Sequence, residues 1–182
     1  VGNCRGYISF SFNGYILVIR FFMKIVSVSE NQSIEKRIAI TPEIAKKYIS
    51  FGFEVFLSKN YGAHLGITDK EYQNVGVKTS NDEKEILNDA NVIVQMGLPS
   101  DDKCSLLKQD QTLIGVLNPY NNKNELDNLI KKKINIFSLE LLPRITRAQS
   151  MDILSSQANL AGYKAVIESF ANFEKAIPMM MT

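Results

Sequence analysis

Segments typical of strands and helices alternate along the chain from Met23 onward, and this alternation limits the folds that are possible. Short apolar runs rich in β-branched residues predict strands or extended pieces at 24–29, 54–57, 75–78, 92–95, 112–116 and 134–138. Segments with apolar residues at helical spacing predict helices at 41–50, 69–73, 82–88, 101–107 and 122–132. Strands joined in this way by helices lie parallel, in a sheet that is covered on both faces. We therefore expect an α/β fold with a doubly wound, mostly parallel sheet of the Rossmann-like or flavodoxin-like kind.

Composition narrows the class of protein further. With 182 residues, 45% of them apolar and 22% charged, the chain is typical of a globular protein of one domain or of one domain plus a fragment. A net charge of +2 and scattered basic residues give no indication of nucleic-acid binding. The most apolar run near the N-terminus, Tyr15–Phe22, is far shorter than the roughly 20 residues of a spanning helix, so we expect no direct membrane insertion. Cys4 and Cys104 do not indicate a disulfide framework, and we expect reduced thiols.

Residues 1–22 differ in character from the rest of the chain. The chain begins with Val1, and Met23 opens the first strand of the alternating pattern. We therefore interpret residues 1–22 as a non-native upstream extension, and residues 23–182 as the native domain. A secretory signal is the alternative, although the cleavage pattern is poor. The stretch from Gly6 to Phe22 is apolar enough to add a strand or to aggregate.

The segment 143–164, PRITRAQSMDILSSQANLAGYK, contains the strongest candidate site. A loop with Arg144 and Arg147 precedes a stretch from Ser150 to Phe173 that is predicted to be one long helix. If helix begins by Gln149, then Gln149, Asp152 and Ser155 recur every three residues and lie within roughly 120° of arc. A guanidinium, an amide, a carboxylate and a hydroxyl together suit the phosphate, ribose and carboxamide groups of a nucleotide. Polar helix faces are usually only solvated, so the spacing alone does not establish a site.

This segment resembles the loop and helix of the NAD(H)-binding domain in the alpha subunit of proton-translocating nicotinamide nucleotide transhydrogenases. The resemblance runs from about Met23 to the last residue. It implies that Arg144, Gln149, Asp152 and Ser155 bind the nicotinamide end of NAD(H), and that the first three of them are catalytic. The polypeptide would then be an enzyme that transfers hydride between NAD(H) and NADP(H), coupled to proton translocation.

The resemblance also implies partners. NADP(H) would be bound by a partner subunit, the transhydrogenase beta subunit, and a membrane domain would complete the assembly. A homodimer is expected, with a cytoplasmic location peripheral to the inner membrane. In this family a second, Gly-rich dinucleotide-binding domain follows, and no GxGxxG sequence occurs in this chain. We therefore expect the chain to be the first half of a two-domain unit, inactive and at best weakly NAD(H)-binding by itself.

Alanine dehydrogenase, which has a related N-terminal domain, is the first alternative. Arg37 resembles its substrate-carboxylate arginine, although a structural arginine paired with a carboxylate such as Glu30 is the preferred interpretation. Amino-acid dehydrogenation needs a proton acceptor. Where that family carries a Lys and a His, this chain has Gly97 and Asn118, neither of which accepts a proton. Hydride transfer between two nicotinamide rings needs no general base, so the transhydrogenase interpretation is favoured.

Two further interpretations remain. His64, the only histidine, lacks neighbours at metal-ligand spacing, and we expect a structural or solvent-exposed role and no metal. The Ser150–Phe173 helix carries many apolar residues and could pack on a partner helix. A non-catalytic α/β domain that dimerises is therefore the second alternative, because this scaffold hosts many functions.

Overall fold

The computed structural model describes residues 6–12, 15–21 and 23–175, with side chains described from Met23 onward. It divides into two units, residues 1–138 and residues 139–182. Cys4 lies outside the described residues, so the expectation about its thiol is untested.

The backbone before Met23 forms a hairpin. Strand β1 (Gly6–Phe12) pairs antiparallel with β2 (Tyr15–Phe21), in a register that places Gly6 opposite Phe21 and Phe12 opposite Tyr15. These strands form a two-stranded sheet separate from the main sheet, so the segment pairs with itself and adds no strand to that sheet. The interpretation of residues 1–22 as an upstream extension stays a prediction.

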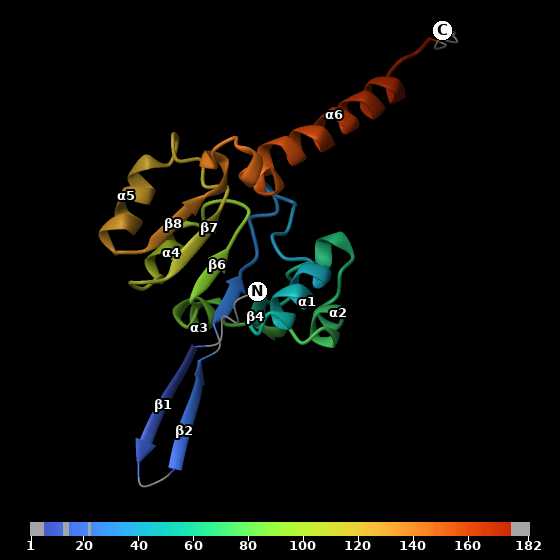
Figure 1. Cartoon of the computed structure of the whole chain (residues 1–182). Helices are drawn as coiled ribbons and strands as arrows, with labels where there is room; N and C mark the ends of the chain where they lie inside the picture. Colours follow the sequence, from blue (N-terminus) through green and yellow to red (C-terminus); the bar gives the residue numbers. More distant parts are fainter. Residues whose placement is uncertain (1–5, 13–14, 22, 176–182) are drawn as a thin grey trace. The chain divides into compact units, whose positions relative to one another are not determined.

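The first unit is built on a six-stranded sheet in which every pairing is parallel (Figure 1). Its strands are β3 (Lys24–Ser27), β4 (Glu54–Ser58), β5 (Lys78–Ser80), β6 (Val92–Val94), β7 (Thr112–Gly115) and β8 (Asn135–Ser138). Their order is β5-β4-β3-β6-β7-β8. The chain thus starts in the middle of the sheet, adds two strands outward, returns to the middle and adds the other half. This order confirms the doubly wound α/β fold.

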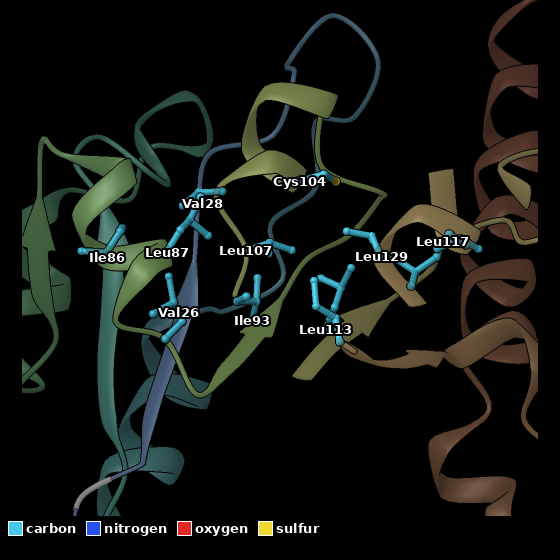
Figure 2. Close-up of a cluster of buried hydrophobic side chains, with 13 residues drawn as sticks. Val26, Val28, Ile86, Leu87, Ile93, Cys104, Leu107, Leu113, Leu117 and Leu129 are labelled. Carbon is cyan, nitrogen blue, oxygen red and sulfur yellow. The ribbon is translucent and has the colours of Figure 1, made fainter. Parts of the chain in front are cut away.

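Helices cover both faces of this sheet (Figure 1). Successive strand residues point to opposite faces, so Ile25 belongs to one buried cluster and Val26 to the other. The cluster with Ile25 includes Ala45 of α1 (Pro42–Ser50) and Tyr72 of α2 (Asp69–Asn74). The cluster with Val26, drawn in Figure 2, takes residues from three other helices. These helices are α3 (Glu83–Asn88), α4 (Asp101–Ser105) and α5 (Lys123–Lys131).

Local sequence explains where several helices begin. Thr41 caps α1, its side-chain oxygen accepting the Ile44 N–H at 3.4 Å, and Pro42 occupies the first turn, where no N–H is needed. Thr68 and Glu71 form a reciprocal capping box at the start of α2. These starts agree with the helices expected at 41–50 and 69–73. The extended piece expected at 75–78 is displaced, because the backbone first turns through Gly76 (φ 96°) and pairs as β5 only from Lys78.

The described part of the second unit, residues 139–175, contains two short 3-10 segments and one long helix. The segments are η2 (Leu139–Leu141) and η3 (Thr146–Met151), and the helix is α6 (Ile153–Ala171). The expected helix start at Ser150 is wrong. Asp152 has φ −73° and ψ 91°, which interrupts the helical backbone, and its side chain caps α6. No residue of α6 is buried.

Candidate functional site

The polar loop before α6 is organised around Asp152. Its carboxylate accepts the Ser155 backbone N–H at 3.1 Å and the Ser155 hydroxyl at 2.6 Å. This is the usual arrangement at a helix N-cap, where a carboxylate satisfies an N–H that has no partner within the helix. The hydroxyl and backbone N–H of Ser155, with a smaller contribution from the charge of Arg144, lower the pKa of Asp152. Asp152 is therefore an ionised acceptor at neutral pH.

A hollow of about 290 Å³ lies beside this cap, and we call it the loop hollow. Its lining consists of Pro143, Arg144, Ile145, Thr146, Ala148, Gln149 and Asp152. The structure therefore brings Arg144, Gln149 and Asp152 together, as expected from the sequence. Ser155 is not part of the lining and contacts Asp152 instead.

The helical stripe expected from the spacing of these residues is wrong. Gln149, Asp152 and Ser155 do not lie on one continuous helix, because Gln149 belongs to η3 and the backbone breaks at Asp152. The group forms because the 3-10 turn folds back, with the Ala148 N–H donating to the Ile145 carbonyl at 2.9 Å. Ala148 is buried, whereas Arg144 and Gln149 are exposed. A buried small residue thus supports a turn whose polar side chains remain accessible.

A second hollow lies in the first unit, where the direction of winding of the sheet reverses. Strands β3 and β6 are neighbours there, and ligands of open α/β sheets usually bind beyond the carboxyl ends of such a pair. A hollow of about 560 Å³ occupies this place, and we call it the switch-point hollow. Its lining consists of Ser29, Glu30, Asn31, Ile34, Glu35, Gln95, Gly97, Leu98, Pro99, Ser100, Lys103 and Asn122.

Glu30, Glu35 and Lys103 are titratable residues of the switch-point hollow, and the sequence did not single out Glu30 as a site. Its carboxylate accepts the backbone N–H groups of Met96 at 2.7 Å and Gly97 at 3.3 Å. Burial raises the pKa of Glu30, and the two N–H groups and the charge of Lys103 oppose that rise. The ammonium of Lys103 donates to the Ser29 carbonyl at 2.8 Å and pairs with Glu83 at 2.9 Å. Glu30 therefore fastens the loop after β3 to the loop after β6.

The positions compared with alanine dehydrogenase are Arg37, Gly97 and Asn118. Arg37 pairs with Glu35 at 2.6 Å, so the expectation of a structural ion pair with a nearby carboxylate is confirmed, with Glu35 as the carboxylate in place of the example Glu30. Gly97 lines the switch-point hollow, and Asn118 lies after β7 with a φ of 48°. Gly97 has no side chain, and the carboxamide of Asn118 is not a proton acceptor. However, the carboxyl group of Glu30 lies in the same hollow as Gly97. The hollow therefore contains one group that could act as an acid or a base.

His64 and Cys104 have local structural contacts. His64 Nε2 lies 2.7 Å from the Lys36 carbonyl oxygen, and Nδ1 lies 3.3 Å from the Gln32 amide nitrogen, so His64 tethers the 31–40 loop. Cys104 is a free, buried thiol that donates to the Pro99 carbonyl at 3.2 Å, and burial raises its pKa to about 11. Such a thiol is unreactive at neutral pH.

The described part of the chain contains neither a group of metal-binding side chains nor a membrane-spanning helix. Among those residues, no three or more His, Cys, Asp or Glu side chains are grouped as metal ligands. Within the same residues, no helix combines the length and the apolar character needed to cross a bilayer.

The fold defines the class of protein, because the parallel sheet is open and doubly wound, as in Rossmann-like domains. A family model described as "Alanine dehydrogenase/PNT, N-terminal domain" matches residues 27–161. The chain therefore belongs to the alanine dehydrogenase/PNT N-terminal domain family.

Individual relatives are consistent with this membership. The chain is 44% identical over 164 residues to the first part of NAD(P) transhydrogenase subunit alpha from Rickettsia prowazekii, a match that covers 88% of this chain and 43% of the relative. It is 40% identical over 165 residues to the protein of the same name from Rhodospirillum rubrum, with coverage of 88% and 43%. The crystal structure of a transhydrogenase from Sinorhizobium meliloti superposes with a TM-score of 0.79 at 38% identity, covering 87% of this chain and 47% of that one. The chain thus spans less than half the length of these relatives.

Proposed function

We propose that this chain is the NAD(H)-binding N-terminal part of a transhydrogenase alpha subunit, and that the loop hollow binds the nicotinamide end of the dinucleotide. The observation that carries the proposal is the grouping of Arg144, Gln149 and Asp152 around one hollow. A nicotinamide carries a carbonyl oxygen and an amide N–H₂, and these three side chains supply complementary donors and acceptors. The bound dinucleotide would supply the hydride.

Arg144 and Gln149 then have separate tasks, and Asp152 and Ser155 share a third. Arg144 donates to the carboxamide oxygen or the adjoining ribose-phosphate through its planar guanidinium. Gln149 has both a donor and an acceptor, and orients the carboxamide so that the ring faces the second nicotinamide. Asp152 and Ser155 hold the start of α6 and complete the acceptor side of the site. Fixing two reactants in one orientation is worth several kcal/mol of a reaction barrier.

The partners follow from the same proposal. NADP(H) would be bound by the transhydrogenase beta subunit, and proton translocation would occur in a membrane domain supplied by the assembly. The chain would be cytoplasmic and peripheral to the inner membrane. We also propose a homodimer. Exposed apolar side chains at coiled-coil spacing on α6, namely Leu160, Tyr163, Ile167 and Phe170, support an association through helix packing.

Substitutions in the loop hollow test the proposal. In the complete enzyme, Gln149→Asn or Asp152→Asn should slow single-turnover hydride transfer by about tenfold or more without unfolding the domain, because misoriented reactants lose rate steeply. Arg144→Ala should weaken NADH binding or slow transfer. Arg147→Ala, on the same turn but outside the hollow lining, is the matched control. Unchanged rates and affinities in all three site variants would contradict these roles.

Alanine dehydrogenase is the second candidate, and one observation favours it. Glu30 places a carboxyl group of raised pKa in the switch-point hollow, where a general base for a small substrate could act. The transhydrogenases among the relatives make this candidate less supported. Alanine-dependent NADH formation by the complete protein, abolished by Glu30→Gln, would establish it. Sedimentation of the chain with and without NADH tests the third possibility, a domain that only dimerises.

A further inference from the structure

A buried amide group faces the switch-point hollow. Gln95 is only 3% exposed, and it belongs to the lining of that hollow. Its side-chain oxygen accepts the Ser27 hydroxyl at 2.8 Å and the Val28 N–H at 3.2 Å. A backbone N–H can only donate, so the atom that faces Val28 is the amide oxygen, and the N–H₂ group of Gln95 points the other way.

This N–H₂ group has no hydrogen-bond acceptor among the described residues. It is not sealed in the core either. Within that part of the chain, Ser138 Oγ is the only side-chain nitrogen or oxygen that is both fully buried and without a partner. The two N–H donors of Gln95 are therefore open to the hollow, and an acceptor supplied by a ligand would satisfy them.

An open acceptor lies beside this donor. Glu30 accepts the N–H groups of Met96 and Gly97 with one carboxylate oxygen, Oε1. Its other oxygen, Oε2, has no hydrogen-bond donor among the residues that the structure describes. Because Met96 follows Gln95 directly in the chain, the Glu30 carboxylate and the Gln95 amide lie in the same part of the hollow.

The charges around the hollow disfavour an anionic ligand. Glu35 is paired with Arg37 at 2.6 Å, and Lys103 is paired with Glu83 at 2.9 Å. Lys103 acts on Glu30 through its charge, but no ion pair joins them among the described residues. A carboxylate placed against Glu30 would therefore be repelled, whereas an uncharged group would not. A cation would be attracted to Glu30 but would face the positive ends of N–H donors.

We propose that the switch-point hollow binds a small uncharged molecule in which a primary carboxamide is attached to an apolar group. The carboxamide oxygen accepts from the Gln95 N–H₂ group, and the carboxamide N–H₂ donates to Glu30 Oε2. The apolar group packs on Ile34, Leu98 and Pro99, which also line this hollow of about 560 Å³. The site is independent of the proposed NAD(H) site. It also differs from the alanine dehydrogenase candidate, whose substrate carries a carboxylate.

The test compares isovaleramide with isovalerate, which have the same arrangement of heavy atoms and differ only in carrying a carboxamide or a carboxylate. Dissociation constants are measured for the 182-residue chain by NMR titration, following the side-chain N–H₂ of Gln95 and the backbone N–H of Gly97. The titration is run at a pH of about 8, well above the ordinary pKa of a carboxyl group. We expect isovaleramide to bind with a dissociation constant of about 1–10 mM, and about tenfold or more tighter than isovalerate.

Two variants assign that preference to Glu30. In Glu30→Gln, the amide oxygen can still accept the Met96 and Gly97 N–H groups, while an N–H₂ donor replaces Oε2. This variant should bind isovalerate at least as tightly as isovaleramide, because the hollow then offers donors and no repelling charge. Glu85→Gln removes an exposed carboxylate from the same unit, outside the lining of the hollow, and should keep the wild-type preference.

Each outcome has one meaning. Failure of isovaleramide to bind, or binding that leaves the Gln95 N–H₂ resonances unmoved, would overturn the site. Equal affinities of the wild-type chain for the two compounds would overturn the preference for an uncharged carboxamide. Tighter binding of isovalerate would overturn it too, and would favour the alanine dehydrogenase candidate. A preference that persists in Glu30→Gln, or that Glu85→Gln also removes, would show that Glu30 is not its source. The NAD(H) proposal is unaffected by these outcomes, because it rests on the loop hollow.

Discussion

Tyr61 shows how one hydroxyl can connect several parts of the fold. Its oxygen accepts the N–H groups of Ala39 at 3.0 Å and Ile40 at 3.3 Å and lies 2.7 Å from Ser27 Oγ. Ser27 donates its own proton to the Gln95 side-chain oxygen at 2.8 Å, so the Tyr61 proton must go to Ser27. The hydroxyl therefore joins β3, the loop before α1 and the loop after β6 in one buried network.

We expect Tyr61→Phe to lower the free energy of unfolding by about 2 kcal/mol, because the buried N–H of Ile40 and the part-buried N–H of Ala39 lose their acceptor. Urea unfolding followed by circular dichroism measures the change. Tyr120→Phe, at a side chain that is 85% exposed, is the matched control and should be neutral. A Tyr61→Phe variant as stable as the wild type would show that this network contributes nothing net.

Glu30 gives the fold a definite dependence on pH. Burial raises its pKa in the folded state above the value in the unfolded chain, so the folded state binds its proton more tightly. The stability from this group is therefore fully present below the unfolded pKa and is lost as pH rises through the folded pKa. Glu30→Gln does not ionise, and its amide oxygen can still accept the Met96 and Gly97 N–H groups.

We expect Glu30→Gln to gain stability relative to the wild type as pH rises from about 4 to 8, since only the wild type must bury a charge. Urea unfolding of both proteins across this range provides the measurement. Glu174→Gln, at an exposed carboxylate, corrects for the loss of one charge. A difference between Glu30→Gln and wild type that stays constant with pH would contradict the expected sign.

At the scale of elements, the contact of β6 with β7 depends on a glycine. A Cβ built on Gly115 of β7 would lie 2.5 Å from the Gln95 backbone oxygen. That oxygen cannot retreat cheaply, because the Gln95 N–H is bonded to the Ile114 carbonyl at 3.0 Å. The absence of a side chain at residue 115 therefore allows the two strand ends beside the switch-point hollow to approach.

Gly115→Ala should destabilise the domain by about 1–3 kcal/mol through strain between these strands. Gly97→Ala is the matched control, since a Cβ there meets nothing within 4 Å. Both variants lose the backbone freedom of glycine in the unfolded chain, but only Gly115→Ala adds a steric clash. The difference between their melting temperatures in thermal unfolding therefore measures the clash. Equal melting temperatures would mean that the sheet absorbs the added methyl group.

The elements also show what local sequence can and cannot predict. The start of α1 was predictable, because Thr41 and Pro42 act within one turn of the helix. The start of α6 was not predictable, because Ser150 and Met151 also fit the spacing of a helix. Only the backbone angles of Asp152 interrupt the helix there. Arg144, Gln149 and Asp152 do line one hollow, but the helical stripe expected to group Gln149, Asp152 and Ser155 was wrong because of this interruption.

At the scale of the whole molecule, the two hollows belong to different units and have different chemistry. The loop hollow is lined by exposed side chains, and the chain contains no Gly-rich sequence that would place backbone N–H groups around a pyrophosphate. Most of the affinity for a dinucleotide would therefore have to come from phosphate-binding groups outside this chain.

We accordingly expect the 182-residue chain to bind NADH with a dissociation constant above about 10 μM, weaker than ordinary cofactor sites. Calorimetric titration of the chain is the measurement, with Arg144→Ala as the control that removes any specific component. A constant below that value would show that the loop hollow needs no further phosphate-binding elements.

The sequence by itself determined the alternation of elements, the α/β class and the residues of the polar loop. All of these depend on side-chain periodicity or on contacts between near neighbours in the chain, such as Asp152 with Ser155. The tertiary structure alone decided that β3 lies beside β6, that Glu30 reaches Met96 and Gly97, and that Tyr61 meets Ser27. These contacts join residues 34 to 67 positions apart, and they exist only because the two faces of one sheet bury their apolar side chains against different helices.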